Sequence, residues 1–272
     1  MAIDWSGLRD PAPGTLVRAR ETAHFAVQWV ARAARANLPA AADDSHTALA
    51  WDAQLVALVS APFPNGARAG LRLAPLELAV LGKGRSERLA LDGRAAGMVD
   101  AWLDAALAAH GLEPASPVEL PYAIPARPLA DSRELAQLAR WFAAAAELVG
   151  ELRAKYREFR PGPGPVRCWP HHFDIAVLVG LEQRDAESSR SIGIGVSPGD
   201  AYYAQPYAYV SPYPRPVAPQ LPALPPGGHW HTRDFFGAVA TADALLAERE
   251  PRAAVSAVID AAFQAGRRWL DV

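Results

Sequence analysis

The chain has 272 residues, of which 51% are hydrophobic and 21% are charged, and its formal net charge is -2. A chain of this length and composition has enough apolar side chains to bury one large core or two smaller ones, which indicates a folded protein rather than a disordered one. The small net charge provides no broad basic surface for non-specific nucleic-acid binding, so nucleic acid is not expected as a partner.

The single cysteine, Cys168, excludes an internal disulfide and the thiolate clusters of structural zinc or iron–sulfur sites. The longest strongly apolar run, residues 175–181, is far shorter than the roughly 20 residues that a membrane-spanning helix needs. The first residues also lack the pattern of a secretory signal. We therefore expect a cytoplasmic protein without a membrane partner.

The first half of the chain predicts a helix, two strands and a second helix. Apolar residues recur at steps of three and four over residues 16–37, which is typical of an amphipathic helix. Residues 49–60 form a short apolar run that predicts a buried strand, and residues 71–81 predict another that Pro75 interrupts. The alanine- and leucine-rich stretch 94–110 predicts the second helix.

Five prolines fall within residues 114–130, and proline removes helix donors and favours extended backbone. This segment therefore predicts a linker between an N-terminal half, residues 1–113, and a C-terminal half, residues 131–272. The same pattern also permits both halves to pack as one domain.

The second half opens with the clearest helix signal in the chain. Asp131 and Glu134 have the spacing of a capping box, and apolar residues then recur at steps of three and four as far as Phe159. The later segments predict strands at 167–181, 192–196 and 202–210, and helices after Thr232 and from Pro251.

The two halves share this order of elements, and Trp51-Asp52 corresponds in place to Phe173-Asp174. Asp52 lies 23 positions before Pro75, and Asp174 lies 24 positions before Pro198. We therefore predict an internal duplication of a helix-strand-strand-helix unit. The expected class is α/β in the broad sense, specifically α+β, with mainly antiparallel sheets covered by helices and a ligand crevice between the halves.

Three short stretches of the second half concentrate the polar candidates: residues 169–174, residues 197–200, which end in Asp200, and residues 228–234. Residues 169–174 read Trp-Pro-His-His-Phe-Asp, and on an extended strand His172 and Asp174 point one way while His171 points the other. Residues 228–234 contain His229 and His231, which also share one face if that stretch is extended.

If these stretches converge, His172, Asp174 and His231 are candidate ligands for a divalent metal such as iron, manganese or zinc. Asp200 and His171 are then the candidate catalytic acid–base groups. The spacing is similar to the facial triad of non-haem iron oxygenases, although the helices argue against the jelly roll of that fold. The same side chains serve equally well as metal-free acid–base groups or as structural hydrogen-bonding partners.

Weaker candidates lie elsewhere in the chain. His24 and Gln28 are one helical turn apart and are expected to approach the strand that carries Asp52, whereas His46 is expected to cap the start of that strand. Tyrosines recur in residues 202–213 and either line a pocket or fill a core. The weaker candidates are thus His24, Gln28, His46, Asp52, His229 and Tyr207.

Residues 169–174, residues 197–200 (Ser-Pro-Gly-Asp), Pro206-Tyr207 and residues 230–232 (Trp-His-Thr) together resemble an uncharacterised bacterial family that carries a WPHHFD motif. In the first half, His24, Gln28 and residues 43–52 contribute to the same resemblance. The resemblance covers most of the chain and implies no activity or ligand set. Gln205 departs from it, since an acidic residue is expected before Pro206-Tyr207.

Two hypotheses of function follow. The first is a metal-dependent enzyme, an oxidoreductase or a hydrolase, that acts on a small molecule at the His/Asp site of the C-terminal half. The alternative is a non-catalytic small-molecule binding or assembly protein in which the same cluster is structural. The sequence leaves the substrate, the metal and the oligomeric state open.

Overall fold

The structure is a computed structural model that describes residues 3–115, 130–182, 189–217 and 219–271. Most of the predicted linker, residues 114–130, lies outside these ranges. The chain divides into two compact units. Unit 1 comprises Met1–Thr15, Ala144–Val166 and Asp174–Val272, and unit 2 comprises Leu16–Ala143 and Arg167–Phe173. Each unit thus contains segments from both sides of the predicted linker.

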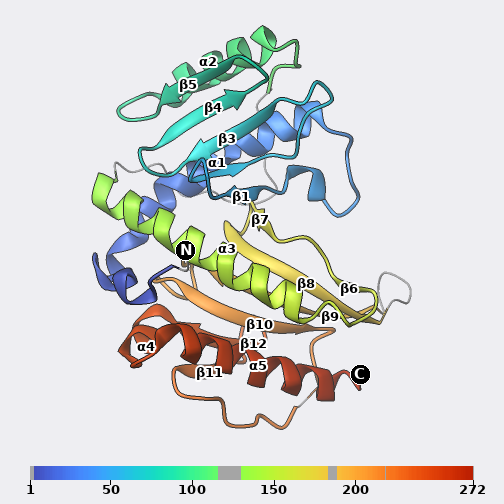
Figure 1. Cartoon of the computed structure of the whole chain (residues 1–272). Coiled ribbons are helices and arrows are strands. Elements are labelled where there is room, and N and C mark those ends of the chain that lie inside the picture. The colour runs from blue at the N-terminus through green and yellow to red at the C-terminus, as the bar shows by residue number, and fades with distance from the viewer. Residues whose placement is uncertain (1–2, 116–129, 183–188, 218, 272) are drawn as a thin grey trace. The chain divides into compact units, whose positions relative to one another are not determined.

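Both units contain an antiparallel sheet and helices, which confirms the predicted α+β class. Unit 2 contains a five-stranded sheet of order β1-β2-β3-β4-β5, and unit 1 contains the main path β11-β12-β10-β9-β8-β6 of the larger sheet (Figure 1). The internal duplication stays a prediction. No helix among the described residues is long and apolar enough to cross a membrane.

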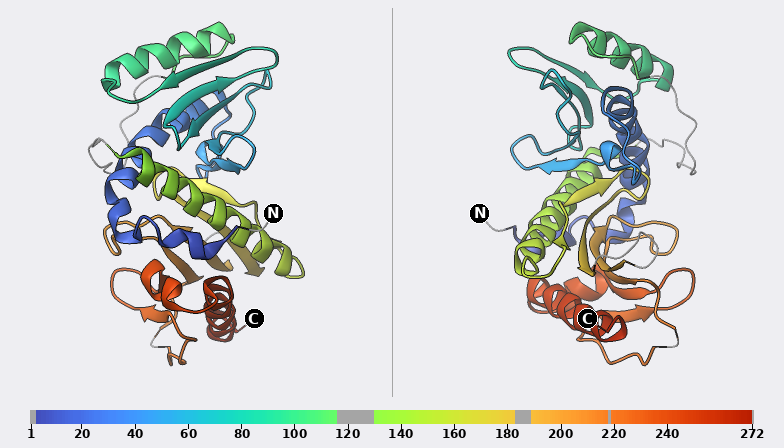
Figure 2. Two further views of the ribbon diagram at one scale, coloured as in Figure 1. Left: turned by 60° about the vertical axis from the view of Figure 1, so that its left-hand side comes forward. Right: turned by 90° about the vertical axis from the view of Figure 1, so that its right-hand side faces the viewer.

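In unit 2, two helices lie on one side of the five-stranded sheet (Figure 2). The strand register places Leu58 opposite Leu71 and Leu71 opposite Leu78, and all three side chains are fully buried. Burial of such leucines supplies the apolar driving force for this unit. Its elements are α1 (Val17–Asn37), β1 (Ala50–Asp52), β2 (Ala57–Val59), β3 (Arg68–Arg72), β4 (Glu77–Leu81), β5 (Ser86–Ala90) and α2 (Ala96–Ala109).

The strand predicted over residues 49–60 is in fact two strands, β1 and β2, joined by a tight turn. The Asp52 carboxylate causes the break, because its Oδ1 accepts hydrogen bonds from the backbone N–H groups of Gln54 and Leu55 at 3.0 Å each. The strand predicted over 71–81 is likewise the end of β3, a turn that contains Pro75, and β4. Strand β5 was not predicted, because its residues alternate between exposed and half-buried positions.

The helix with the strongest sequence signal is α3 (Ser132–Lys155). Its start agrees with the predicted cap, since the Asp131 carboxylate accepts a hydrogen bond from the Arg133 N–H at 2.7 Å. The division between the units falls within this helix, after Ala143.

The strand predicted over 167–181 is interrupted by a turn at residues 170–173. Strand β7 (Arg167–Trp169) belongs to unit 2, and β8 (Asp174–Glu182) belongs to unit 1. The Trp169 carbonyl accepts hydrogen bonds from the N–H groups of His172 and Phe173, and Phe173 has a φ of 58°. The extended geometry that was expected to put His172 and Asp174 on one face is therefore wrong.

Unit 1 has a sheet with two chemically different faces. One face carries Ile192, Pro212 and Trp230, and it packs against helix α5 (Pro251–Trp269). Gly266 of α5 lies so close that a Cβ there would be 2.9 Å from Ile192, and the Trp230 and Trp269 rings are 5.0 Å apart. The strands and short helix of this unit are β6 (Gly162–Pro163), β8, β9 (Arg190–Ser197), β10 (Tyr207–Tyr213), β11 (Gly228–His231), β12 (Gly237–Thr241) and α4 (Ala242–Ala247).

The opposite face of this sheet is polar, and we call it the polar face. Register places Tyr209 opposite both Gly195 and Val239, and Val239 opposite His229, so these residues point to one side. The members of the polar face that concern the site are Asp174, Gly195, Ser197, Tyr207, Tyr209, His229 and His231.

The Tyr209 ring lies directly over Gly195, where an added Cβ would be 2.6 Å from the phenol oxygen. We therefore predict that Gly195→Ala lowers the free energy of unfolding by about 1–3 kcal/mol, the usual cost of overpacking. Urea unfolding of the variant measures this loss.

Gly193→Ala is the matched control, because Gly193 lies on the same strand and face but its added Cβ would contact only Ser211 O, at 3.7 Å. In a Tyr209→Ala background, Gly195→Ala is expected to lower the free energy of unfolding much less than it does in the wild type, because the ring that the new Cβ would meet is gone. Equal stability of the two glycine variants would contradict the close contact.

Candidate functional site

The structure separates the predicted site residues into two sets. Unit 1 contains the candidates with polar contacts on or beside its polar face: Asp174, Asp200, Tyr207, His229 and His231. Unit 2 contains His24, Gln28, His46, Asp52, His171 and His172.

Two tyrosine–carboxylate pairs occupy the polar face. The Tyr209 hydroxyl donates to Asp174 Oδ2 at 2.5 Å, and the Tyr207 hydroxyl donates to Asp200 Oδ2 at 2.5 Å. Burial, followed by the neighbouring carboxylate, raises the pKa of both phenols. Each phenol therefore keeps its proton and supplies the donor that a carboxylate removed from water requires.

Asp200 also shapes the loop that carries the next tyrosine. Its Oδ1 accepts the backbone N–H groups of Tyr202 and Tyr203 at 2.8 and 3.1 Å, the pattern of an Asx turn. The carboxylate thus holds the turn with one oxygen and the Tyr207 phenol with the other. This use of both oxygens favours a positioning role for Asp200 over the predicted acid–base role.

The Tyr203 hydroxyl lies between two imidazoles. It is 2.8 Å from His229 Nε2 and 2.9 Å from His231 Nδ1. Strand β11 is extended as predicted, so both histidines lie on the same face of the sheet. Burial, and then repulsion from His231, lowers the pKa of His229, whereas burial and the Asp200 carboxylate raise the pKa of Tyr203. We call Tyr203, His229 and His231 the Tyr203 triad.

The His231 ring is held between aromatic neighbours. It stacks on Phe235 with 4.1 Å between ring centroids and 9° between planes, and the half-exposed Tyr202 ring meets it edge to face. Its Nε2 atom is buried and, within the described part of the chain, has no hydrogen-bond partner. A buried nitrogen in this state costs about 1–3 kcal/mol, which a ligand group can recover.

In unit 2, His24 and Gln28 of α1 bind the same backbone carbonyl. His24 Nε2–H donates to Pro170 O at 2.9 Å, and Gln28 Nε2–H donates to it at 2.8 Å. The His24 ring also stacks on Phe173 at 5.2 Å. These side chains hold the turn at residues 170–173, whereas the sequence placed them against the strand that carries Asp52. Their contacts are those of a structural clamp.

His171 and His172 lie on this turn, with 4.2 Å between their ring centroids. His171 is half-buried and His172 is exposed. Burial, and then repulsion from His172, lowers the pKa of His171. Neither side chain belongs to the unit that contains Asp174 and His231.

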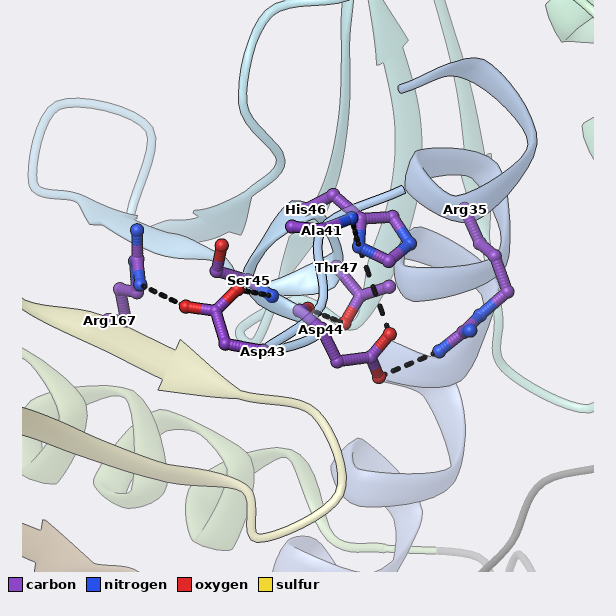
Figure 3. Close-up of polar contacts among 8 residues, drawn as sticks. All are labelled: Arg35, Ala41, Asp43, Asp44, Ser45, His46, Thr47 and Arg167. Carbon is purple, nitrogen blue, oxygen red and sulfur yellow. Dashed lines mark hydrogen bonds and ion pairs between the residues drawn. The ribbon is translucent and has the colours of Figure 1, made fainter. Parts of the chain in front are cut away.

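His46 belongs to a loop that polar contacts hold within unit 2 (Figure 3). Its Nδ1 accepts the Ala41 N–H at 3.2 Å and lies 3.8 Å from an Asp44 oxygen. Asp44 pairs with Arg35 at 2.9 Å, and Asp43 lies 3.9 Å from Arg167 of β7. His46 therefore stabilises this loop, and Asp52 stabilises the β1–β2 turn.

The donor set does not fit the predicted metal site. Among residues 3–115, 130–182, 189–217 and 219–271, no three His, Cys, Asp or Glu side chains form a group that could hold a metal ion. Asp174 Oδ2 instead contacts the Tyr209 hydroxyl, and His231 Nδ1 contacts the Tyr203 hydroxyl.

The site contains residues that sequence reasoning did not single out. Tyr203 and Tyr209 were recognised only as members of a tyrosine-rich run, and Phe235 was not considered. The sequence contains one usable signal: Tyr207 and Tyr209 are two positions apart, and side chains alternate faces along a strand, so these two tyrosines are expected on one face. No local signal marks Gly195 as the glycine beneath Tyr209, because that contact joins two strands.

Comparisons with known proteins add no relative: no family model, curated protein or solved structure matches this chain. The resemblance to a WPHHFD family therefore stays a prediction.

The His24 clamp makes the stability of unit 2 dependent on pH. Burial lowers the pKa of His24 to about 4, against an ordinary value of 6.5, so the unfolded chain binds this proton more readily than the folded one. The contribution of His24 to the free energy of unfolding is therefore complete above about pH 6.5. It falls by roughly 3 kcal/mol as the pH is lowered to about 4.

The contribution of His24 to this pH dependence is measured by chemical denaturation of the wild type and of His24→Gln at several pH values between about 4 and 6.5. The variant is expected to lose less stability on acidification than the wild type. His171 and His229 titrate in the same direction and are common to both proteins. Parallel pH profiles for the two proteins would rule out the clamp as the source of the effect.

Proposed function

We propose that unit 1 binds a small polar molecule at the Tyr203 triad, with His231 Nε2 as the group that contacts it. The observation that carries the proposal is this buried nitrogen without a hydrogen-bond partner in the described structure. Proteins seldom keep such an atom unless a ligand, an ion or water completes it.

The surroundings of His231 support a preformed site. Its ring position is set by the bond from Nδ1 to Tyr203 at 2.9 Å and by the stack on Phe235. A side chain locked by both a hydrogen bond and a ring contact loses little entropy when a ligand binds. The half-exposed Tyr202 ring contacts the rings of both His231 and Phe235.

The polar neighbours favour a ligand that forms hydrogen bonds rather than an apolar one. Tyr203 is already bound to both histidines, and Tyr207 already binds Asp200. The ligand is therefore expected to use His231 Nε2 directly and the exposed Tyr202 ring for apolar contact. The proposal keeps the small-molecule binding of the alternative hypothesis from the sequence, but it places His231 at the ligand instead of in a structural cluster.

Binding is tested by calorimetry and by thermal shift with four probes: inorganic phosphate, acetate, glycerol and phenol. We expect saturable binding of at least one probe to the wild type. His231→Asn is expected to weaken it by about tenfold or more, which corresponds to about 1.4 kcal/mol, because the shorter amide mimics Nδ1 and keeps a bond to Tyr203 but lacks Nε2.

Two further variants make this test specific. His231→Gln restores an amide group near the position of Nε2 and is expected to recover part of the affinity. His172→Asn changes an exposed histidine of unit 2 and is expected to bind as the wild type does. Absence of binding by all four probes, or equal binding by His231→Asn, would overturn the proposal.

A metal requirement is tested separately. We expect protein purified without chelators to contain no stoichiometric iron, manganese or zinc, because the described donors do not form a three-ligand group. EDTA is expected to leave the unfolding temperature unchanged. Elemental analysis that finds one metal per chain, lost in His231→Asn, would instead support the metal-dependent enzyme predicted from the sequence.

A further inference from the structure

We infer that the Tyr203 triad is a proton relay that makes His231 a general base toward the bound molecule. The inference rests on the proposed binding function for its substrate, a small molecule with an ionisable hydrogen. It goes beyond binding because it assigns a direction of proton movement through named atoms.

The relay follows from the number of hydrogens that Tyr203 has. A phenol has one O–H hydrogen, so Tyr203 donates to only one of its two imidazole neighbours and accepts from the other. With both histidines neutral, one of the two contacting nitrogens, His229 Nε2 and His231 Nδ1, carries a hydrogen and the other does not. The tautomers of His229 and His231 are thereby coupled.

This coupling defines two states of His231 Nε2. If Tyr203 donates to His231, then Nε2 carries the hydrogen of that imidazole and is a donor. If Tyr203 donates to His229, then His231 Nδ1–H donates to the phenol oxygen and Nε2 is a bare acceptor. The second state is the base.

Proton abstraction converts the second state into the first. The bond from hydrogen to the ligand breaks, and a bond from that hydrogen to His231 Nε2 forms. The Nδ1 proton passes to the Tyr203 oxygen, the phenol proton passes to His229 Nε2, and the His229 Nδ1 proton passes to water. One proton leaves the ligand and one reaches water, so charge and atoms balance and the ligand keeps the electron pair.

The burial of the three residues suits this direction. His229 is exposed, Tyr203 is half-buried and the His231 Nε2 atom is fully buried. Burial and repulsion from His231 lower the pKa of His229, which favours release of the proton at the solvent side. General bases that exchange protons with solvent in this way avoid storing a charge in a buried position.

Two other charged groups, Asp200 and Arg233, act on the triad. The Asp200 carboxylate acts on Tyr203 from the same loop and raises its pKa, and Arg233 acts in the opposite direction. Asp200 is already bonded to Tyr207 and to two backbone N–H groups. The shortest hydrogen-bonded route from His231 therefore runs through Tyr203 to His229.

Nitrogen NMR of the full chain tests the relay without a substrate. The protein is labelled with ¹⁵N-histidine, the signals are assigned with His229→Asn and His231→Asn, and spectra are recorded from about pH 5 to pH 9. At neutral pH we expect His229 Nε2 and His231 Nδ1 to share a single proton, so that a larger protonated fraction at one means a smaller fraction at the other. The two tautomer ratios are expected to change together with pH.

Tyr203→Phe removes the shared hydroxyl and is expected to make the tautomers of His229 and His231 independent. Tyr213→Phe is the matched control on the same chain, because Tyr213 is half-exposed at the end of β10 and the triad's hydrogen bonds join only Tyr203, His229 and His231. Its spectra at both histidines are expected to match the wild type.

Two results would overturn the relay: protonated fractions at the two contacting nitrogens of the wild type that do not add up to a single proton at neutral pH, or unchanged histidine spectra in Tyr203→Phe. This outcome is separate from that of the binding experiment. Coupled tautomers with no bound probe would retain the relay and reject the proposed ligand site, and probe binding with uncoupled tautomers would do the reverse.

Discussion

The close approach of the Tyr209 ring to Gly195 is the constraint on which the polar face of unit 1 depends. A hydrogen at position 195 lets the Tyr209 ring approach the neighbouring strand closely and place its hydroxyl 2.5 Å from Asp174. The adjacent Tyr207 then extends the same row of rings toward Asp200 and Tyr203. A larger residue beneath Tyr209 would displace the first member of that row.

The two faces of this sheet divide stability and chemistry between them. The face against α5 contains the fully buried Ile192 and the half-buried Trp230, whose ring meets that of Trp269. On the polar face, one oxygen of Asp174 and one of Asp200 accept hydrogen bonds from phenols, which stay protonated because burial raises their pKa. His231 Nε2, by comparison, is buried and has no hydrogen-bond partner among the described residues, which is the reason for proposing a ligand there.

Unit 2 uses the conspicuous histidines of the sequence for a different purpose. His24 and Gln28 converge on one carbonyl, so the Trp-Pro-His-His-Phe turn is held by side chains that are 142 or more positions away in sequence. Burial of His24 favours its neutral form, which lets it act as a hydrogen-bond donor without burying a charge. A cluster of titratable residues in a sequence is thus not by itself a catalytic site.

Local sequence determined the α+β class, the long helices α1, α3 and α5, and the shared face of His229 and His231 in β11. Each depends on periodicity or capping within one segment. Only the tertiary structure decided that Asp174 pairs with Tyr209, that Tyr203 joins two histidines, and that residues 170–173 turn away from an extended path. Those contacts join segments up to 35 positions apart in unit 1, or arise from backbone bonds within a turn, and no residue pattern within one segment specifies them.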